Sequence, residues 1–144
     1  MDKNKFPVQL SLRIDWAELD LFGHVNNVMF IKYIQAARVN YWEKIGLYQQ
    51  FLETKCGPML ASVTCNFLKP LHYPGDIIIQ TRMNYIKNTS FSLQHIILND
   101  QNETVARSED VMVMFDFNTN EKINFPDDLR KAVILLEGKE FSIS

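Results

Sequence analysis

One segment of the chain places an acid, a glycine and two asparagines immediately before a helical pattern. It reads Asp15-Trp16-Ala17-Glu18-Leu19-Asp20-Leu21-Phe22-Gly23-His24-Val25-Asn26-Asn27. The first turn of a helix carries unpaired N–H groups and the positive end of the helix dipole, which polarise a carbonyl oxygen and stabilise a developing oxyanion. A nearby carboxylate can attack that carbonyl or activate a water beside it. The segment therefore predicts acyl-transfer chemistry such as thioester hydrolysis, for which neither a metal nor a cofactor is required.

Asp20 is the acid that we favour for this chemistry. Glu18 lies in the same segment, but an extended chain over residues 17–20 places the two acids on one face only approximately, and Asp20 is nearer to the glycine turn. An isolated acid before a glycine most often forms a turn or a cap. The whole string, followed by an amphipathic helix, favours catalysis over that alternative.

The helix that must position this segment is predicted from the spacing of apolar side chains. They recur at alternating steps of four and three residues, which is typical of one helix face: Phe30, Ile34, Ala37, Tyr41 and Ile45. Asn26 or Asn27 suits the N-cap, and Gly46 suits the left-handed residue that ends a helix. The pattern predicts a helix from about residue 27 to about residue 45.

Beyond this helix the apolar period changes from 3.6 to 2, which predicts strands. The first of them is expected to bury one face, composed of Met59, Ala61, Val63, Cys65 and Phe67. Further strands are expected over residues 77–85, 91–97 and 104–117, with an earlier strand near residues 8–15 and a short helix beginning near Pro126. Short turns between the last four strands predict antiparallel neighbours. The fold class is therefore α+β, with an antiparallel sheet wrapped around a long central helix and a short C-terminal helix.

Length and charge set the outer limits. A chain of 144 residues with 47% hydrophobic content predicts a single globular domain over residues 1–144. A net charge of −2 without a dominant basic patch argues against a general nucleic-acid binder. Residues 1–7 lack an apolar signal core, and no stretch approaches the roughly 20 apolar residues of a membrane span. We therefore expect a cytoplasmic protein without a membrane partner.

Two cysteines are too few and too isolated for a disulfide framework or a zinc site, so Cys56 and Cys65 are both expected to be reduced thiols. Cys65 falls within the alternating strand pattern and is predicted to be a small buried apolar residue. A cysteine nucleophile paired with His72 or His95 is the alternative that the sequence leaves open.

The string from Leu19 to Asn27, with Ala37-Arg38 and Gly46-Leu47 downstream, resembles the hotdog-fold acyl-CoA thioesterases of the 4-hydroxybenzoyl-CoA thioesterase superfamily. The resemblance covers nearly the whole chain, including Phe67 to Asp76 with its Pro70 and the strand ending in Phe115-Asp116-Phe117. It implies a hotdog fold and a dimer with two active sites at the subunit interface, often paired further into tetramers.

The resemblance also implies roles for single residues. Asp20 is the catalytic carboxylate, and backbone amides from Gly23 through His24 and Val25 to Asn26 hold the thioester carbonyl. His24 matches a frequent histidine of the family and is interpreted as a positioning residue.

Three further expectations concern substrate binding. Asn26 and Asn27 match the family and act as helix caps or as substrate contacts. Four residues are expected to line the acyl pocket or to belong to the core: Phe22, Val25, Phe30 and Tyr33. By resemblance, the phosphates of coenzyme A lie at a turn between the middle strands, here composed of Lys87, Asn88, Thr89 and Ser90. A solvated hairpin turn is the alternative for this segment.

Departures from the family pattern bear on the substrate. Phe30 stands where many relatives have Tyr, and Phe22 stands where the plant acyl-carrier-protein thioesterases have Asn. Residues 27–42 contain no Asp or Glu, which argues against a hydroxybenzoyl substrate and favours an apolar acyl group.

Three functions therefore stand. The preferred one is an acyl-CoA thioesterase with Asp20 as general base or nucleophile. The alternatives are an acyl-carrier-protein thioesterase and a non-catalytic acyl-CoA binding protein on the same fold.

Overall fold

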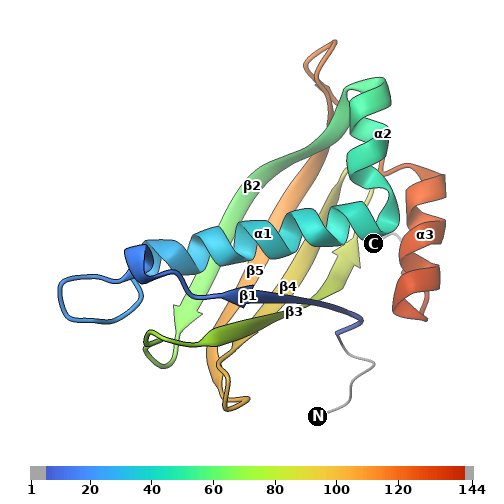
Figure 1. The fold of residues 1–144 in the computed structure, drawn as a ribbon. Coiled ribbons are helices and arrows are strands. Elements are labelled where there is room, and N and C mark those ends of the chain that lie inside the picture. The colour runs from blue at the N-terminus through green and yellow to red at the C-terminus, as the bar shows by residue number, and fades with distance from the viewer. Residues whose placement is uncertain (1–5, 142–144) are drawn as a thin grey trace.

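The computed structural model describes residues 6–141 of the chain (Figure 1). Residues 1–5, which belong to the N-terminal stretch without a signal core, lie outside the described residues. In chain order the elements are β1 (Val8–Arg13), the 3-10 turn η2 (Trp16–Glu18), α1 (Asn27–Ile45), α2 (Leu47–Thr54), β2 (Cys56–Phe67), β3 (Asp76–Ile86), β4 (Ser90–Leu98), β5 (Thr104–Asp116), β6 (Glu121–Lys122) and α3 (Asp127–Glu137). Among residues 6–141, no helix has both the length and the apolar content that crossing a bilayer would take.

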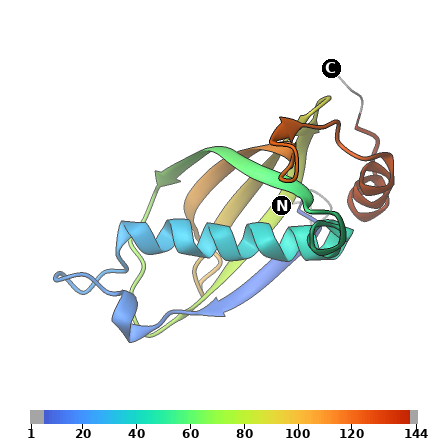
Figure 2. The same cartoon turned by 90° about the horizontal axis from the view of Figure 1, so that it is seen from above.

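The strands form one antiparallel sheet in the order β1-β3-β4-β5-β2, and β6 adds a short pairing to β5. Seen from above, the sheet curls around α1, while α3 lies at the far end of the helix (Figure 2). This arrangement confirms the predicted α+β class, in which a sheet wraps around a long helix and a short helix follows.

The long helix α1 begins and ends where its capping residues require. The Asn26 side chain accepts a hydrogen bond from the Val28 N–H at 3.0 Å, and Gly46 adopts a left-handed φ of 83°. The helix therefore spans Asn27–Ile45, as the spacing predicts. Its buried face also contains two polar residues outside the apolar pattern, Tyr33 and Arg38.

The predicted order of neighbouring strands is only partly right. The hairpins between β3 and β4 and between β4 and β5 are confirmed, but β2 pairs with β5, and β3 pairs with β1 instead of β2. The segment between β2 and β3 is longer than a tight hairpin turn, so it carries the chain across to the other side of the sheet. It passes the loop before α1, where the Val25 N–H donates to the Leu71 carbonyl at 2.9 Å.

The predicted buried face of β2 is wrong. Met59 is 42% exposed and Phe67 is 44% exposed, while Val63 and Cys65 are only half-buried. The helix α1 packs mainly against β1, β3 and β4, and α2 contacts β2 at its start, beside Pro58, so within the described residues most of β2 lies at a sheet edge without a helix over it. The alternating pattern identified the strand but gave no information on what covers it.

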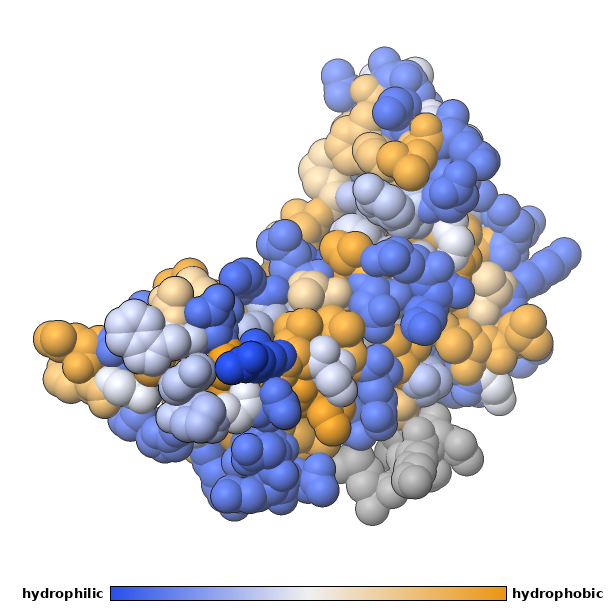
Figure 3. Space-filling model, viewed as in Figure 1, coloured by the Kyte–Doolittle hydropathy of each residue, from blue (hydrophilic) through white to orange (hydrophobic). Residues whose placement is uncertain are grey.

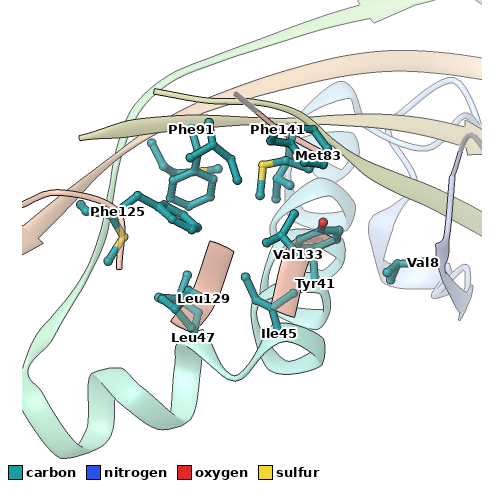
Figure 4. Close-up of a cluster of buried hydrophobic side chains, with 14 residues drawn as sticks. Val8, Tyr41, Ile45, Leu47, Met83, Phe91, Phe125, Leu129, Val133 and Phe141 are labelled. Atoms are coloured by element: carbon teal, nitrogen blue, oxygen red, sulfur yellow. The ribbon is translucent and has the colours of Figure 1, made fainter. Parts of the chain in front are cut away.

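Two apolar clusters hold α1 against the sheet. At the C-terminal half of the helix, Tyr41 packs with Phe91 of β4 and Val133 of α3 (Figure 4). At the N-terminal half, Phe30 packs in a second cluster with Ile77 of β3. The second cluster fixes the end of the helix that follows the Asp20 loop.

Candidate functional site

Asp20 lies in a tight loop that its own side chain organises. Its Oδ1 atom accepts hydrogen bonds from the backbone N–H groups of Phe22 at 2.8 Å and His24 at 3.1 Å. Gly23 supplies the turn with a left-handed φ of 81°, and its N–H donates to the Asp20 carbonyl at 3.2 Å. Within the described residues, Oδ2 makes no hydrogen bond. One carboxylate oxygen is thus fixed, while the other is available to a water or to a carbonyl carbon.

Glu18, the second acid of the segment, is committed to the fold. Its Oε1 atom accepts from the Tyr33 hydroxyl at 2.6 Å and from the Asp15 N–H at 2.9 Å, and its Oε2 atom faces Lys32 Nζ at 3.3 Å. Burial by itself raises the pKa of Glu18, but the hydrogen bonds from Tyr33 and Asp15 outweigh it and lower the pKa below its usual value. Glu18 therefore anchors α1 as an ionised group, which leaves Asp20 as the available acid.

The backbone amides expected to hold a carbonyl are all engaged within the chain. Gly23 N–H and His24 N–H bind Asp20, Val25 N–H binds the Leu71 carbonyl, and Asn26 N–H binds the Glu18 carbonyl at 2.9 Å. These bonds shape the loop and leave none of the four donors for a ligand. This differs from the expectation, because spacing cannot show which amides a folded loop consumes.

Asn27, the first residue of α1, has the one amide between residues 22 and 30 that finds no acceptor in the described part of the chain. Its position at the helix N-terminus places it at the positive end of the helix dipole. The free donor of this segment is therefore the Asn27 N–H.

Five of the predicted site residues line one hollow of about 240 Å³, namely Asp20, His24, Val25, Asn27 and Phe30. Four residues that the sequence did not assign to the site complete its lining: Phe67, Leu68, Lys69 and Pro70. They come from the end of β2 and the connection that follows it. The Phe67 ring meets the Phe30 ring in an edge arrangement at 5.2 Å, so an apolar surface adjoins the carboxylate.

Two further groups lie at the edge of this hollow. His24 and His72 form an isolated antiparallel bridge, and their rings meet edge to face at 4.9 Å. Lys69 pairs with Glu103 at 2.5 Å. The contact between His24 and Asp20 runs through the backbone amide and carbonyl of His24, which is consistent with a positioning role for this residue.

The structure does not bring every predicted residue to the hollow. Phe22 is 80% exposed at the tip of the loop, and Asn26 is occupied as the helix cap. The turn from Lys87 to Ser90 lies at the far end of β3, roughly 35 Å of strand away. Asn88 and Thr89 accept hydrogen bonds there from the backbone of Phe125 and Met114. Within one chain, this turn and Asp20 are separate.

The structure disfavours a cysteine nucleophile paired with His95. Burial raises the pKa of the Cys65 thiol, and nearby Asp110 raises it further, so the thiolate is disfavoured. His95 uses both ring nitrogens, bonding Thr81 Oγ1 at 2.9 Å and Asp110 Oδ2 at 2.7 Å. Cys56 and Cys65 are both free thiols, as expected.

Behind the site lies a buried polar group that the sequence did not predict. Arg38 of α1 donates through Nε to Asp110 Oδ2 of β5 at 2.8 Å, and Asp110 also meets His95. Asp110 is completely buried, yet the bonds from His95 and Arg38 overcome the effect of burial and lower its pKa. The pair therefore links the helix to the sheet as ions.

A curled antiparallel sheet around one long helix is a fold that this chain shares with solved thioesterase structures. The model of the thioesterase-like superfamily matches residues 14–133, which include the whole hollow. The chain belongs to the thioesterase-like superfamily. This membership supports thioester hydrolysis as its class of activity.

Individual relatives agree with this assignment. The chain is 26% identical over 129 residues to the acyl-acyl carrier protein thioesterase ATL3 of Arabidopsis thaliana, covering 88% of this chain and 67% of that protein. It is 20% identical over 127 residues to the long-chain acyl-CoA thioesterase FadM of Escherichia coli, covering 88% of this chain and 96% of that protein. A thioesterase from Thermus thermophilus, solved with coenzyme A and zinc, has the same fold, with a TM-score of 0.84 and 23% identity over 95% of this chain and 98% of that one.

Proposed function

We propose that the protein hydrolyses acyl-CoA thioesters in the hollow between the Asp20 loop and the end of β2. The observation that carries the proposal is the pairing of two unused groups within it. The Oδ2 atom of Asp20 and the N–H of Asn27 have no partners among residues 6–141, and both residues line the hollow. A carboxylate and an oxyanion donor are the two elements that thioester hydrolysis needs.

The chemistry follows from these two groups. The thioester carbonyl oxygen accepts a hydrogen bond from the Asn27 N–H. Asp20 Oδ2 takes a proton from a water, and the oxygen of that water attacks the carbonyl carbon. The oxyanion of the tetrahedral intermediate is stabilised by the hydrogen bond from the Asn27 N–H. The C–S bond then breaks, and the leaving sulfur takes the proton from Asp20. In the nucleophilic variant, Oδ2 attacks the carbon directly and the C–S bond breaks, so that the thiolate leaves and takes a proton from solvent; water then cleaves the acyl anhydride to the free acid and the Asp20 carboxylate. Both routes release a free acid and a thiol.

The apolar side of the hollow supports an apolar acyl group. Phe30 and Phe67 form this side, and no acid from α1 reaches it, since residues 27–42 contain none. An acyl chain on these rings is taken out of water, which favours hydrocarbon over a charged acyl group.

The thiol of the substrate has two candidates, coenzyme A and an acyl carrier protein. FadM acts on acyl-CoA by its name, and the Thermus protein was solved with coenzyme A, so we assign coenzyme A first. An acyl carrier protein is the second candidate because ATL3 is named for that donor. The turn from Lys87 to Ser90 contains a single lysine and would therefore bind the phosphates of coenzyme A weakly, which keeps the carrier protein as a candidate.

The proposal is tested by thiol release from short, long and aromatic acyl-CoAs, with acyl carrier protein thioesters as a parallel series. Asp20→Asn retains an oxygen that accepts from Phe22 and His24, so the loop is preserved while the base is lost. We expect activity to fall by about 10²-fold or more. Asp100→Asn, in an exposed turn, is the matched control. Unchanged activity in a folded Asp20→Asn variant would rule out the assigned role.

The β2 edge supports the self-association that the family resemblance implies. Within the described residues, β2 pairs only with β5, and its other edge is open. Exposed edge strands usually carry charges that prevent pairing with other chains, but Cys56–Phe67 contains none. The opposite edge strand, β1, ends in Arg13. We therefore assign β2 as the dimer edge.

A further inference from the structure

Two exposed apolar features of the chain have no role in the chemistry proposed above. The first is the tip of the Asp20 loop, where Leu21 is 94% exposed and Phe22 is 80% exposed. Two adjacent large apolar side chains at such exposure are unusual for a loop tip. The loop extends away from the body of the protein (Figure 1), and apolar surface gathers there (Figure 3).

The second feature is an apolar groove of about 190 Å³ between α2 and the start of β2. Its lining is almost entirely aromatic or aliphatic: Trp42, Leu47, Tyr48, Phe51, Pro58 and Phe117. Tyr48 is 46% exposed and Phe117 is 42% exposed, so the groove opens to the surface. Apolar surface also gathers over α2, in the upper part of the view in Figure 3.

The strand β2 runs from one feature to the other. Pro58 lines the groove at one end of the strand, while Phe67 lines the hollow beside Asp20 at the other end. Phe67 lies nine steps along the extended strand from Pro58, which corresponds to roughly 30 Å. A tip of two side chains cannot cross that distance, so the loop cannot reach the groove of its own chain.

In a dimer, the loop of one copy can lie next to the groove of the other copy. A two-fold axis normal to the sheet pairs β2 with β2 of the other copy in antiparallel direction, because each end of the strand then meets the opposite end. The Phe67 end of one copy, with its loop, comes beside the Pro58 end of the other copy, with its groove. Neither element carries a charge that would oppose the contact, since Leu21 and Phe22 are apolar and so are the groove residues.

We propose that Leu21 and Phe22 of each copy insert into the Trp42–Phe117 groove of the second copy, so that each catalytic loop is held by its partner. This inference rests on the proposed function and on the β2 dimer. The backbone N–H of Phe22 binds Asp20 Oδ1, so fixing the Phe22 side chain also fixes the carboxylate. Phe22 is thus a positioning residue. The groove of the partner copy holds the loop in place but contributes no reacting atom.

Cross-linking tests the contact without reference to activity. Two differently tagged chains, both with Cys56→Ser and Cys65→Ser, carry Phe22→Cys in one and Tyr48→Cys in the other. We expect a disulfide-linked heterodimer on a non-reducing gel after mild oxidation. The control partner carries Lys131→Cys, on α3 away from the groove. Cross-linking that fails, or that is equally efficient with Lys131→Cys, would overturn the proposal.

Trans-complementation then tests the consequence for catalysis. Tyr48→Glu places a charge in the groove and should lower thioester hydrolysis by about 10- to 100-fold, because a displaced loop misplaces its carboxylate. Asp20→Asn removes the base but keeps the groove. In a mixed dimer, the Asp20 of the Tyr48→Glu chain is held by the intact groove of the Asp20→Asn chain, so one site works.

Random exchange of the two chains gives about half heterodimers, and the mixture should recover about a quarter of wild-type activity. Activity no greater than the sum of the two separate variants would mean that the groove acts within its own chain, against the proposal. If the wild type hydrolyses no thioester, the proposed function fails, while the cross-link still decides the docking.

Discussion

At the scale of single residues, most backbone N–H groups at the N-terminus of α1 bind acceptors within the chain, and one is available for the proposed chemistry. The amides of Gly23 through Asn26 build the loop, and the Asn27 N–H has no acceptor among residues 6–141. Residue types identified the acid and the helix cap, since both depend on side chains. The free amide depends on which carbonyls fold back on the loop, among them those of Glu18 and Leu71, and no side-chain pattern records this.

The amide can be deleted with little disturbance to the helix. Asn27 is the first helical residue, where proline is well tolerated, and the preceding Asn26 has φ −61° and ψ 138°, which suit a residue before proline. Asn27→Pro should therefore fold and lose about 10²- to 10³-fold in kcat. Asn27→Ala retains the N–H and measures the side chain alone. Equal kcat values for the two variants, with melting temperatures matched, would exclude the amide as the oxyanion donor.

At the scale of elements, α1 and the hairpins were predictable, and the path of β2 was not. Asn26 and Gly46 are local signals that fix both ends of the helix. The pairing of β2 with β5 depends on β1 occupying the position beside β3, which is a property of the assembled sheet. For the same reason Phe67 and Lys69 were missed as site residues, although Pro70 nearby was part of the family resemblance.

The joint between α1 and β5 depends on the buried pair of Arg38 and Asp110. Arg38→Met leaves the buried Asp110 carboxylate with His95 as its remaining partner and should lower the free energy of unfolding by about 3 kcal/mol. Adding Asp110→Asn removes that charge while leaving an oxygen for His95, so the double variant should recover part of the loss. Denaturant unfolding of the four species completes the cycle. Losses that simply add would show that the two side chains stabilise the protein independently.

At the scale of the whole molecule, the open edge of β2 and the protruding loop are the two features on which the proposed association rests. The apolar pattern of β2 resembled that of a buried strand, but the single chain exposes Met59 and Phe67. A strand without charges, exposed on both faces, is expected to be covered by another molecule. Sequence periodicity reports that a side chain will be buried, while the molecule that buries it is set by the assembly.

Charge on that edge should therefore separate the copies and stop the chemistry together. Thr64→Lys lies opposite Glu109 in the register with β5, so the substitution should be tolerated within the chain. In a β2 pair, each added lysine lies at the edge where the two copies meet, and a charged lysine there opposes pairing. We expect light scattering to give the 16.8 kDa mass of one chain, with thioester hydrolysis reduced in parallel. Gln9→Lys on the other edge strand, β1, is the matched control and should leave the dimer mass and the activity in place. A Thr64→Lys variant that remains dimeric, or a monomer with full activity, would contradict a site completed through β2.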